Sequence, residues 1–257
     1  MKLIKNLLTQ NNCYKAGETI TPKGIMVHST GANNPKLKRY VQPNIEGIGV
    51  NKYSNDWNRP KPDGQSKCTH AFIGKLENGD IATVQTLEWN YRGWHCGEGK
   101  NGSANDTHIS FEICEDGLTD KTYFDKVYKE AVELCAYLCR LYKLNPKEDG
   151  VIICHSEGHK RGIASNHGDV MHWFPKHNKN MDTFRADVYA ELNKPKPNVQ
   201  TGGETYFKIK TNEDIVVYAK TDKTAPKGVY TIIETKGNMG KLKSGAGWVN
   251  LSEVTKI

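Results

Sequence analysis

The sequence predicts an α/β domain, with a central β-sheet flanked by helices, followed by a second, small all-β domain. Three observations lead to this fold class. Short apolar runs suit buried strands, one long segment has helical periodicity, and the composition changes near residue 193. At 257 residues the chain is long enough for one domain with a sizeable core and a smaller second one.

The strands of the first domain are predicted from short apolar or alternating runs. "GIMVHS" and "GVIICHS" are apolar runs that end at a histidine, and "HISFEIC" alternates Ile109, Phe111 and Ile113 with polar or small residues. "AFIGKLENGDIATVQ" places Asn78-Gly79 between two extended segments. This dipeptide favours a tight turn, so the segment predicts a β-hairpin.

A long amphipathic helix is predicted from Thr122 to Lys143, and Thr122 with Asp125 resembles a capping box. The apolar residues at helical spacing are Val127, Ala131, Leu134, Leu138 and Leu141. Cys135 and Cys139 lie four residues apart on this helix, as a pair of metal ligands would. An apolar helix face more often buries thiols as small hydrophobic groups, which is the interpretation adopted here.

A second helix is predicted from Asp182 to Leu192, and it ends the first domain, residues 1–193. "NKPKPNVQTGGE" follows, with two prolines and two glycines, and we assign residues 194–204 to a linker. Residues 205–257 contain the short β-rich runs "YFKIK", "IVVYAK", "GVYTIIE", "MGKLK" and "GWVNL". They predict a small barrel, which suits a binding module better than a catalytic one.

The net charge and the cysteine content limit the classes of partner and the cellular compartment to be expected for the protein. A net charge of +7 and a pI near 8.9 favour an anionic partner, which could be nucleic acid, a membrane surface or a cell-wall polymer. The seven cysteines include no Cys-x-x-Cys pair, so we expect no disulfide framework, no cysteine zinc ribbon and maturation in a reducing compartment. No apolar stretch suits a signal peptide or a membrane helix, which predicts synthesis as a soluble cytoplasmic protein.

Histidines are concentrated in residues 153–177, a window that holds five of the nine in the chain and a single aspartate, Asp169. A catalytic zinc site needs three converging side chains and an open fourth position. His155 and His28 each follow an apolar run and would project from neighbouring strand ends, while Asp169 follows a loop that can fold back. These three form a plausible tripod, and the other histidines of the window, His159, His172 and His177, remain possible ligands.

Four motifs in order, "IMVHST", "GWHCGEG", "ISFEIC" and "CHSEG…HGDVMHWFP", resemble the type 2 zinc N-acetylmuramoyl-L-alanine amidases. That family shares its fold with the peptidoglycan recognition proteins. The resemblance covers roughly residues 1–193 and implies a mixed central sheet flanked by helices.

The resemblance implies that His28, His155 and Asp169 bind Zn²⁺ and that Glu112 is the catalytic carboxylate. It also implies that the substrate is the amide bond between N-acetylmuramic acid and L-alanine in peptidoglycan. Many members have a lysine two residues before the last ligand, where it stabilises charge on the reacting carbonyl oxygen. This chain has His167 there, and a histidine that donates a hydrogen bond can supply the same stabilisation.

Trp94 and His95 in "RGWHCGEG" are expected to edge the cleft and bind substrate, because an aromatic face suits sugar rings or peptide stems; simple packing is the alternative. The tail, most clearly "MGKLKSGAGWVNL", resembles a bacterial SH3-like cell-wall-binding domain. Its aromatic residues either contact wall polymer or fill the core; they are Tyr206, Tyr218, Tyr230 and Trp248.

The whole chain resembles bacteriophage endolysins of Gram-positive bacteria, with a prophage or autolytic enzyme as the alternative origin. This implies synthesis in the host cytoplasm, release without a signal peptide, and degradation of the cell wall with peptidoglycan and a wall polymer as partners. Neither nucleic acid nor stable membrane insertion is expected. Two alternatives are a non-catalytic peptidoglycan-binding protein and a cysteine-dependent endopeptidase using Cys154 and His155. The second is disfavoured because adjacent strand residues point to opposite faces.

Overall fold

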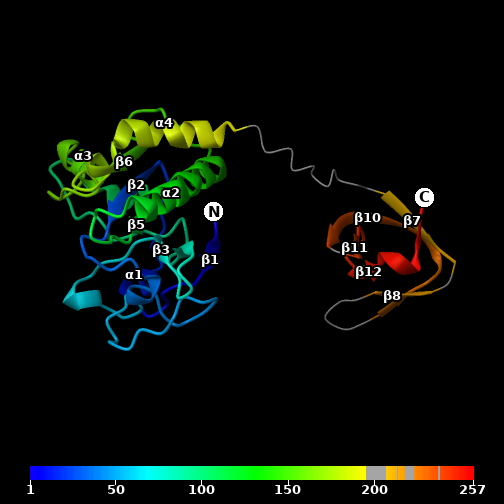
Figure 1. Ribbon diagram of the computed structural model, residues 1–257. Helices are drawn as coiled ribbons and strands as arrows, with labels where there is room; N and C mark the ends of the chain where they lie inside the picture. Colours follow the sequence, from blue (N-terminus) through cyan, green and yellow to red (C-terminus); the bar gives the residue numbers. More distant parts are fainter. Residues whose placement is uncertain (195–206, 213, 218–222, 237) are drawn as a thin grey trace. The chain divides into compact units, whose positions relative to one another are not determined.

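A computed structural model describes residues 1–194, 207–212, 214–217, 223–236 and 238–257. Internal contacts divide the chain into two compact units, Met1–Asn193 and Lys194–Ile257 (Figure 1). Apart from Lys194, the predicted linker at residues 194–204 lies outside the described residues. Each unit is described by itself below.

The first unit is built on a six-stranded mixed sheet with strand order β1-β4-β3-β5-β2-β6. The strands are β1 (Leu3–Lys5), β2 (Gly24–Ser29), β3 (Ala71–Lys75), β4 (Ile81–Gln85), β5 (His108–Ile113) and β6 (Ile152–Cys154). Only β3 and β4 pair antiparallel; the other neighbours are parallel. The predicted mixed sheet flanked by helices is therefore confirmed.

The β3–β4 pair forms the hairpin that Asn78-Gly79 predicted. Gly79 has a φ of +88°, a left-handed conformation that glycine adopts without a steric penalty. The strands β2, β5 and β3 run parallel side by side, so their carboxyl ends meet at one edge of the sheet. Residues that follow these strands can therefore form one site.

The helices are α1 (Asn12–Ala16), α2 (Lys121–Tyr142), α3 (His155–Lys160) and α4 (Met181–Leu192). The two long helices, α2 and α4, pack against each other, and α2 also contacts β3 and β4 (Figure 1). The N-cap of α2 is Asp120, whose side chain accepts a hydrogen bond from the Tyr123 amide, so the cap lies two residues before the predicted Thr122. Cys135 and Cys139 are buried in the apolar cluster that α2 shares with the sheet.

The two faces of the sheet have different contents because side chains alternate along each strand. On one face, Val27 of β2 and Phe111 of β5 pack against the apolar side of α2. The neighbouring residues, His28 and Glu112, consequently point to the opposite face. That face carries the polar site.

Cys13 of α1 and Cys68, just before β3, form a disulfide, whereas the sequence predicted no disulfide framework and a reducing compartment. The two cysteines are 55 residues apart, and neither belongs to a spacing motif, so the pairing depends on the tertiary fold alone. The other five cysteines are buried as free thiols.

The second unit has a five-stranded antiparallel sheet and a two-stranded sheet of β8 and β9. The larger sheet has the order β12-β11-β10-β7-β13. The strands are β7 (Phe207–Thr211), β8 (Ile215–Val217), β9 (Lys223–Ala225), β10 (Gly228–Lys236), β11 (Met239–Leu242), β12 (Trp248–Asn250) and β13 (Thr255–Lys256). A separate all-β region at this end of the chain was predicted and is confirmed.

A small apolar core holds the second unit together and includes Ile209, Ile232 and Val249. Tyr230 is half-buried against this core, and its hydroxyl donates to the carbonyl of Pro226. Trp248 is half-buried, whereas Tyr206 and Tyr218 lie outside the described residues. Of the predicted aromatic contacts, Tyr230 thus contributes to packing.

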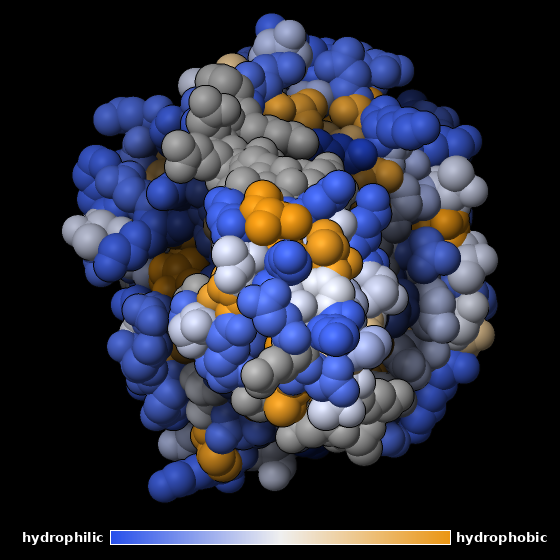
Figure 2. Space-filling model, turned by 90° about the vertical axis from the view of Figure 1, so that its right-hand side faces the viewer, coloured by the Kyte–Doolittle hydropathy of each residue, from blue (hydrophilic) through white to orange (hydrophobic). Residues whose placement is uncertain are grey.

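The surface shown in Figure 2 is mostly hydrophilic, and its hydrophobic residues form small separate groups. Isolated apolar residues of this kind are normal on a protein surface. Among the described helices, none is both long enough and apolar enough to cross a bilayer.

Candidate metal centre

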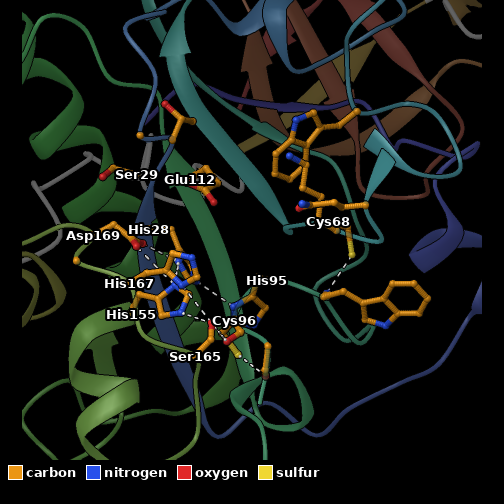
Figure 3. A pocket seen from close by; sticks show the side chains of 18 of the residues that line it. His28, Ser29, Cys68, His95, Cys96, Glu112, His155, Ser165, His167 and Asp169 are labelled. Carbon is orange, nitrogen blue, oxygen red and sulfur yellow. Dashed lines mark hydrogen bonds and ion pairs between the residues drawn. The ribbon is translucent and has the colours of Figure 1, made fainter. Parts of the chain in front are cut away.

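Three donor residues from distant parts of the chain meet at the carboxyl edge of the sheet. His28 is buried in β2, and His155 is the first residue of α3, immediately after β6. The strands β2 and β6 are paired at Val27 and Cys154, which places the two histidines beside each other. Asp169 lies on the segment that returns from α3. Figure 3 shows the three side chains pointing toward one another.

The distances between the donor atoms suit a single metal ion. The Nδ1 atom of His28 lies 2.9 Å from Oδ2 of Asp169 and 3.2 Å from Nδ1 of His155, and Oδ1 of Asp169 lies 3.6 Å from Nδ1 of His155. With bonds of about 2.0–2.1 Å, two donors on a tetrahedral zinc ion are roughly 3.3–3.4 Å apart. The group of His28, His155 and Asp169 could therefore hold a metal ion.

The pKa values of the three donor residues are shifted by burial and by one another. Burial lowers the pKa of His28, but the hydrogen bond and the charge of Asp169 outweigh burial, and the net pKa is raised. Burial raises the pKa of Asp169, yet His28 outweighs it and the net pKa is lowered. His155 has its pKa lowered to about 4, mainly by burial and then by the charge of His28. The negative charge of Asp169 thus favours a positive charge on His28, the place where a cation would lie.

Glu112 lies next to this cluster on the neighbouring strand. His28 and Glu112 are register partners in β2 and β5, so their side chains lie side by side on the same face of the sheet (Figure 3). The Oε2 atom of Glu112 is buried and has no hydrogen-bond partner among the described residues. Burial is the main cause that raises the pKa of Glu112 to about 8. Near neutral pH this carboxyl can therefore both accept and donate a proton.

His95 and Trp94 line the same cavity, which has a volume of about 580 Å³. Nδ1 of His95 lies 2.9 Å from Nε2 of His28, so this ring contacts a candidate metal ligand directly. Its Nε2 atom is buried without a partner among the described residues. The Trp94 amide donates to the sulfur of Cys68, which ties the edge of the cavity to the disulfide.

His167 is exposed at the edge of the cavity, beside the ring of His155. Its Nδ1 atom lies 3.1 Å from Oγ of Ser165. The other histidines of the window are not part of the donor cluster. His159 contacts the carbonyl of Ala164, and the ring of His177 stacks on Phe124.

Several residues of the cavity were missed in the sequence. Trp57 and Lys67 line it, and the Lys67 ammonium lies 4.8 Å from the centre of the Trp57 ring. They come from an irregular segment whose sequence has no periodicity that predicts its position. His172, a possible ligand from the sequence, lies outside the donor cluster but lines the cavity, and its Nε2 atom is 2.9 Å from Oε1 of the buried Glu115. Glu115 follows β5 closely, which is the signal that could have identified it.

The cysteine alternative has little support at this site. Cys154 is buried, and burial raises the pKa of its thiol, which disfavours the nucleophilic thiolate. Its sulfur contacts the hydroxyl of Ser156. Cys96, the free cysteine that lines the cavity, also has a pKa raised by burial.

Several solved structures have a fold similar to that of the first unit. A Staphylococcus aureus hydrolase, AmiA, solved in complex with its ligand, is similar with a TM-score of 0.53 and 18% identity, over 75% of this chain and 83% of that one. The PlyG catalytic domain is similar with a TM-score of 0.51 and 20% identity, over 76% of this chain and 98% of that one. The catalytic domain of XlyA is similar with a TM-score of 0.51 and 20% identity, over 73% of this chain and 99% of that one. At these identities the likeness shows the fold.

Sequence comparison identifies the family. No curated protein matches the sequence. The family model described as N-acetylmuramoyl-L-alanine amidase matches residues 18–175, which include β2, β5, β6 and all three donor residues. This match spans more than half of the chain. The chain therefore belongs to the N-acetylmuramoyl-L-alanine amidase family, whose members are peptidoglycan hydrolases.

Proposed function

We propose that the chain is a zinc-dependent N-acetylmuramoyl-L-alanine amidase that cleaves the amide bond between N-acetylmuramic acid and L-alanine. The observation that carries the proposal is the group of His28, His155 and Asp169, with donor atoms within 4.8 Å of one another, beside Glu112. The buried Oε2 of Glu112 has no hydrogen-bond partner among the described residues. Two imidazoles and one carboxylate are a donor set of the kind found in catalytic zinc sites. The residues present therefore fit zinc.

A zinc ion held by His28, His155 and Asp169 would lower the pKa of a water molecule toward about 7 and would polarise the scissile carbonyl. Glu112 accepts a proton from the attacking water and returns it to the amine nitrogen of L-alanine as the amide bond breaks. A cation in the site would lower the pKa of this buried carboxyl and favour the carboxylate form that accepts the proton. Because Glu112 and His28 are fixed by strand register, the proton acceptor stays next to the reacting groups.

His167 is proposed to stabilise negative charge on the carbonyl oxygen from the edge of the cavity. Trp94 is proposed to contact the glycan or the peptide stem, because it lines the cavity and is partly exposed. His95 also lines the cavity and is proposed to act with Trp94 in binding substrate.

The second unit is proposed to be an SH3-like module that binds an anionic wall polymer. Residues 194–257 contain eleven lysines against six acidic residues, so this unit carries most of the positive charge of the chain. Binding driven by such charge weakens as salt screens it. Sedimentation with purified Gram-positive walls at increasing ionic strength tests this, and salt-independent binding would contradict it.

We further propose that the protein is a bacteriophage endolysin that reaches the wall after release from the host cytoplasm. The amidase family and the combination of a hydrolase unit with a basic β-unit support this role. Lysis of host cells when the protein is added from outside, or expressed together with a membrane-lesion protein, tests it.

Mass analysis of digested peptidoglycan tests the bond that is cleaved. We expect new L-alanine amino termini, loss of activity with a strong chelator, and recovery with zinc. New reducing sugar ends would instead identify a glycosidase, and inhibition by thiol alkylation without sensitivity to chelators would identify a cysteine enzyme. Glu112→Gln, which keeps the side-chain size, is the matched inactive control. Binding of peptidoglycan without any product would identify the non-catalytic alternative.

A further inference from the structure

The inner nitrogens of the two candidate ligand histidines face the metal centre, and their outer nitrogens each meet a different partner. Nε2 of His28 contacts Nδ1 of His95 at 2.9 Å. Nε2 of His155 lies 3.3 Å from Oγ of Ser165 (Figure 3). That hydroxyl is also 2.9 Å from the carbonyl oxygen of Cys96 and 3.1 Å from Nδ1 of His167. Ser165 therefore has three polar partners around one oxygen.

The position of each proton around the Ser165 hydroxyl follows from whether each partner can donate or only accept a hydrogen bond. The Cys96 carbonyl can only accept, so the single hydrogen of the Ser165 hydroxyl is donated to it. The remaining two lone pairs of Oγ can only accept, which requires a proton on Nε2 of His155 and on Nδ1 of His167. In a neutral His155 ring, Nδ1 is then the nitrogen with the free lone pair. This is the atom that faces His28 and Asp169.

We propose that Ser165 is a positioning residue that selects the tautomer and ring orientation of His155, so that Nδ1 is presented as a metal donor, and that the same hydroxyl anchors His167 at the edge of the cavity. The proposal rests on the metal site of the proposed function. An outer hydrogen bond that fixes a ligand histidine typically changes metal affinity by about 10- to 100-fold when it is removed.

The backbone around Ser165 is built to hold the hydroxyl in place. The Ser165 amide donates to the same Cys96 carbonyl at 2.8 Å, so the serine is attached at two points. Gly97 has a φ of +64°, and a Cβ atom added there would lie 3.1 Å from Oγ of Ser165. Any larger residue at position 97 would thus be strained and would crowd the hydroxyl. Oδ1 of Asn105 accepts the amides of His95 and Cys96, which fixes the carbonyl that Ser165 contacts.

One serine therefore connects two histidine side chains of the cavity and the backbone next to a third. It fixes His155 and His167 directly, and through Cys96 it contacts the segment that carries His95. Its loop also carries His167 and Asp169, both predicted as site residues, but nothing in the sequence indicated a role for the serine itself.

The zinc affinity of the full chain tests the proposal, measured by competition with a chromophoric chelator. We expect Ser165→Ala to bind zinc about 10- to 100-fold more weakly than wild type, and Ser165→Thr, which keeps the hydroxyl, to recover most of the loss. Ser156→Ala is the matched control, because Ser156 adjoins His155 but its hydroxyl contacts the sulfur of Cys154. An affinity of Ser165→Ala within about twofold of wild type would overturn the proposal.

Nitrogen NMR of ¹⁵N-histidine-labelled wild-type protein tests the tautomers directly and does not depend on whether Ser165→Ala folds. With zinc bound, we expect the ring proton of His155 on Nε2 and that of His167 on Nδ1. A proton on Nδ1 of His155 would refute the assignment. If wild-type protein binds no zinc at all, the proposed function fails with it; if zinc binds and only the serine effects are absent, this inference alone fails.

Discussion

Replacing His70 by glutamine should make the first unit less sensitive to acid. His70 is fully buried, accepts the Ser110 amide on Nδ1 at 3.0 Å and contacts the Tyr91 carbonyl with Nε2 at 2.8 Å. The ring is therefore neutral, with its proton on Nε2, and a second proton would face the Ser110 N–H. Burial is the main cause that lowers its pKa to about 4.

The magnitude follows from the difference in proton binding between the folded and unfolded states. The folded pKa of about 4 lies below the unfolded value of about 6.5, so the unfolded chain binds more protons between these two pH values. The contribution of His70 to stability is complete above about pH 6.5 and is lost as pH falls toward 4. The full difference is about 3 kcal/mol, of which about 2 kcal/mol is lost by about pH 5.

Urea unfolding followed by tryptophan fluorescence, on chelated protein at about pH 7.5 and about pH 5, measures the effect. Wild type should lose about 2 kcal/mol more unfolding free energy over this interval than His70→Gln, in which an amide can make both hydrogen bonds without titrating. His159→Gln measures the background of losing one exposed histidine. Equal losses in wild type and His70→Gln would show that His70 is not held neutral, and the reasoning from burial would be wrong.

Three further predictions concern the site and its support. Glu112→Gln should bind zinc as wild type does while its turnover falls by about 10²–10⁴-fold, measured by amine release; retained turnover would remove Glu112 from proton transfer. His167→Ala should lower turnover about 10²-fold or more, whereas His167→Lys should retain it, since lysine supplies the charge found in many relatives; equal loss in both would argue against an electrostatic role. Replacing Cys13 and Cys68 together by serine should lower the unfolding free energy by up to about 4 kcal/mol, as expected for a loop of 55 residues, and an unchanged urea midpoint would contradict this.

The elements that could be predicted are those whose burial leaves a periodic pattern. β2 was predicted as "GIMVHS" and spans Gly24–Ser29, and the hairpin around Asn78-Gly79 forms as expected. Sheet geometry places the residues at the ends of such strands. This is why the sequence could predict that His28 and His155 lie beside each other. Asp169 could be added because it is the single aspartate in the histidine window.

The rest of the site depends on long-range contacts that leave no local pattern. The Cys13–Cys68 disulfide joins a short helix to an irregular segment, and no cysteine spacing indicated it. Trp57 and Lys67 enter the cavity from the same region, whose sequence has no strand or helix periodicity. The contact between His28 and His95 links segments 67 residues apart, so the sequence could place His95 near a cleft but could not show that it touches a ligand.

The pairing of His28 with Glu112 across β2 and β5 has a practical meaning for protein engineering. Neighbouring strands are about 4.8 Å apart whatever the surrounding loops do, so the sheet itself sets the spacing between these two side chains. The walls formed by Trp57 and Trp94 come from outside the six strands. Loops bearing different aromatic or basic residues can therefore be grafted there to change what the cavity binds while His28 and Glu112 keep their spacing.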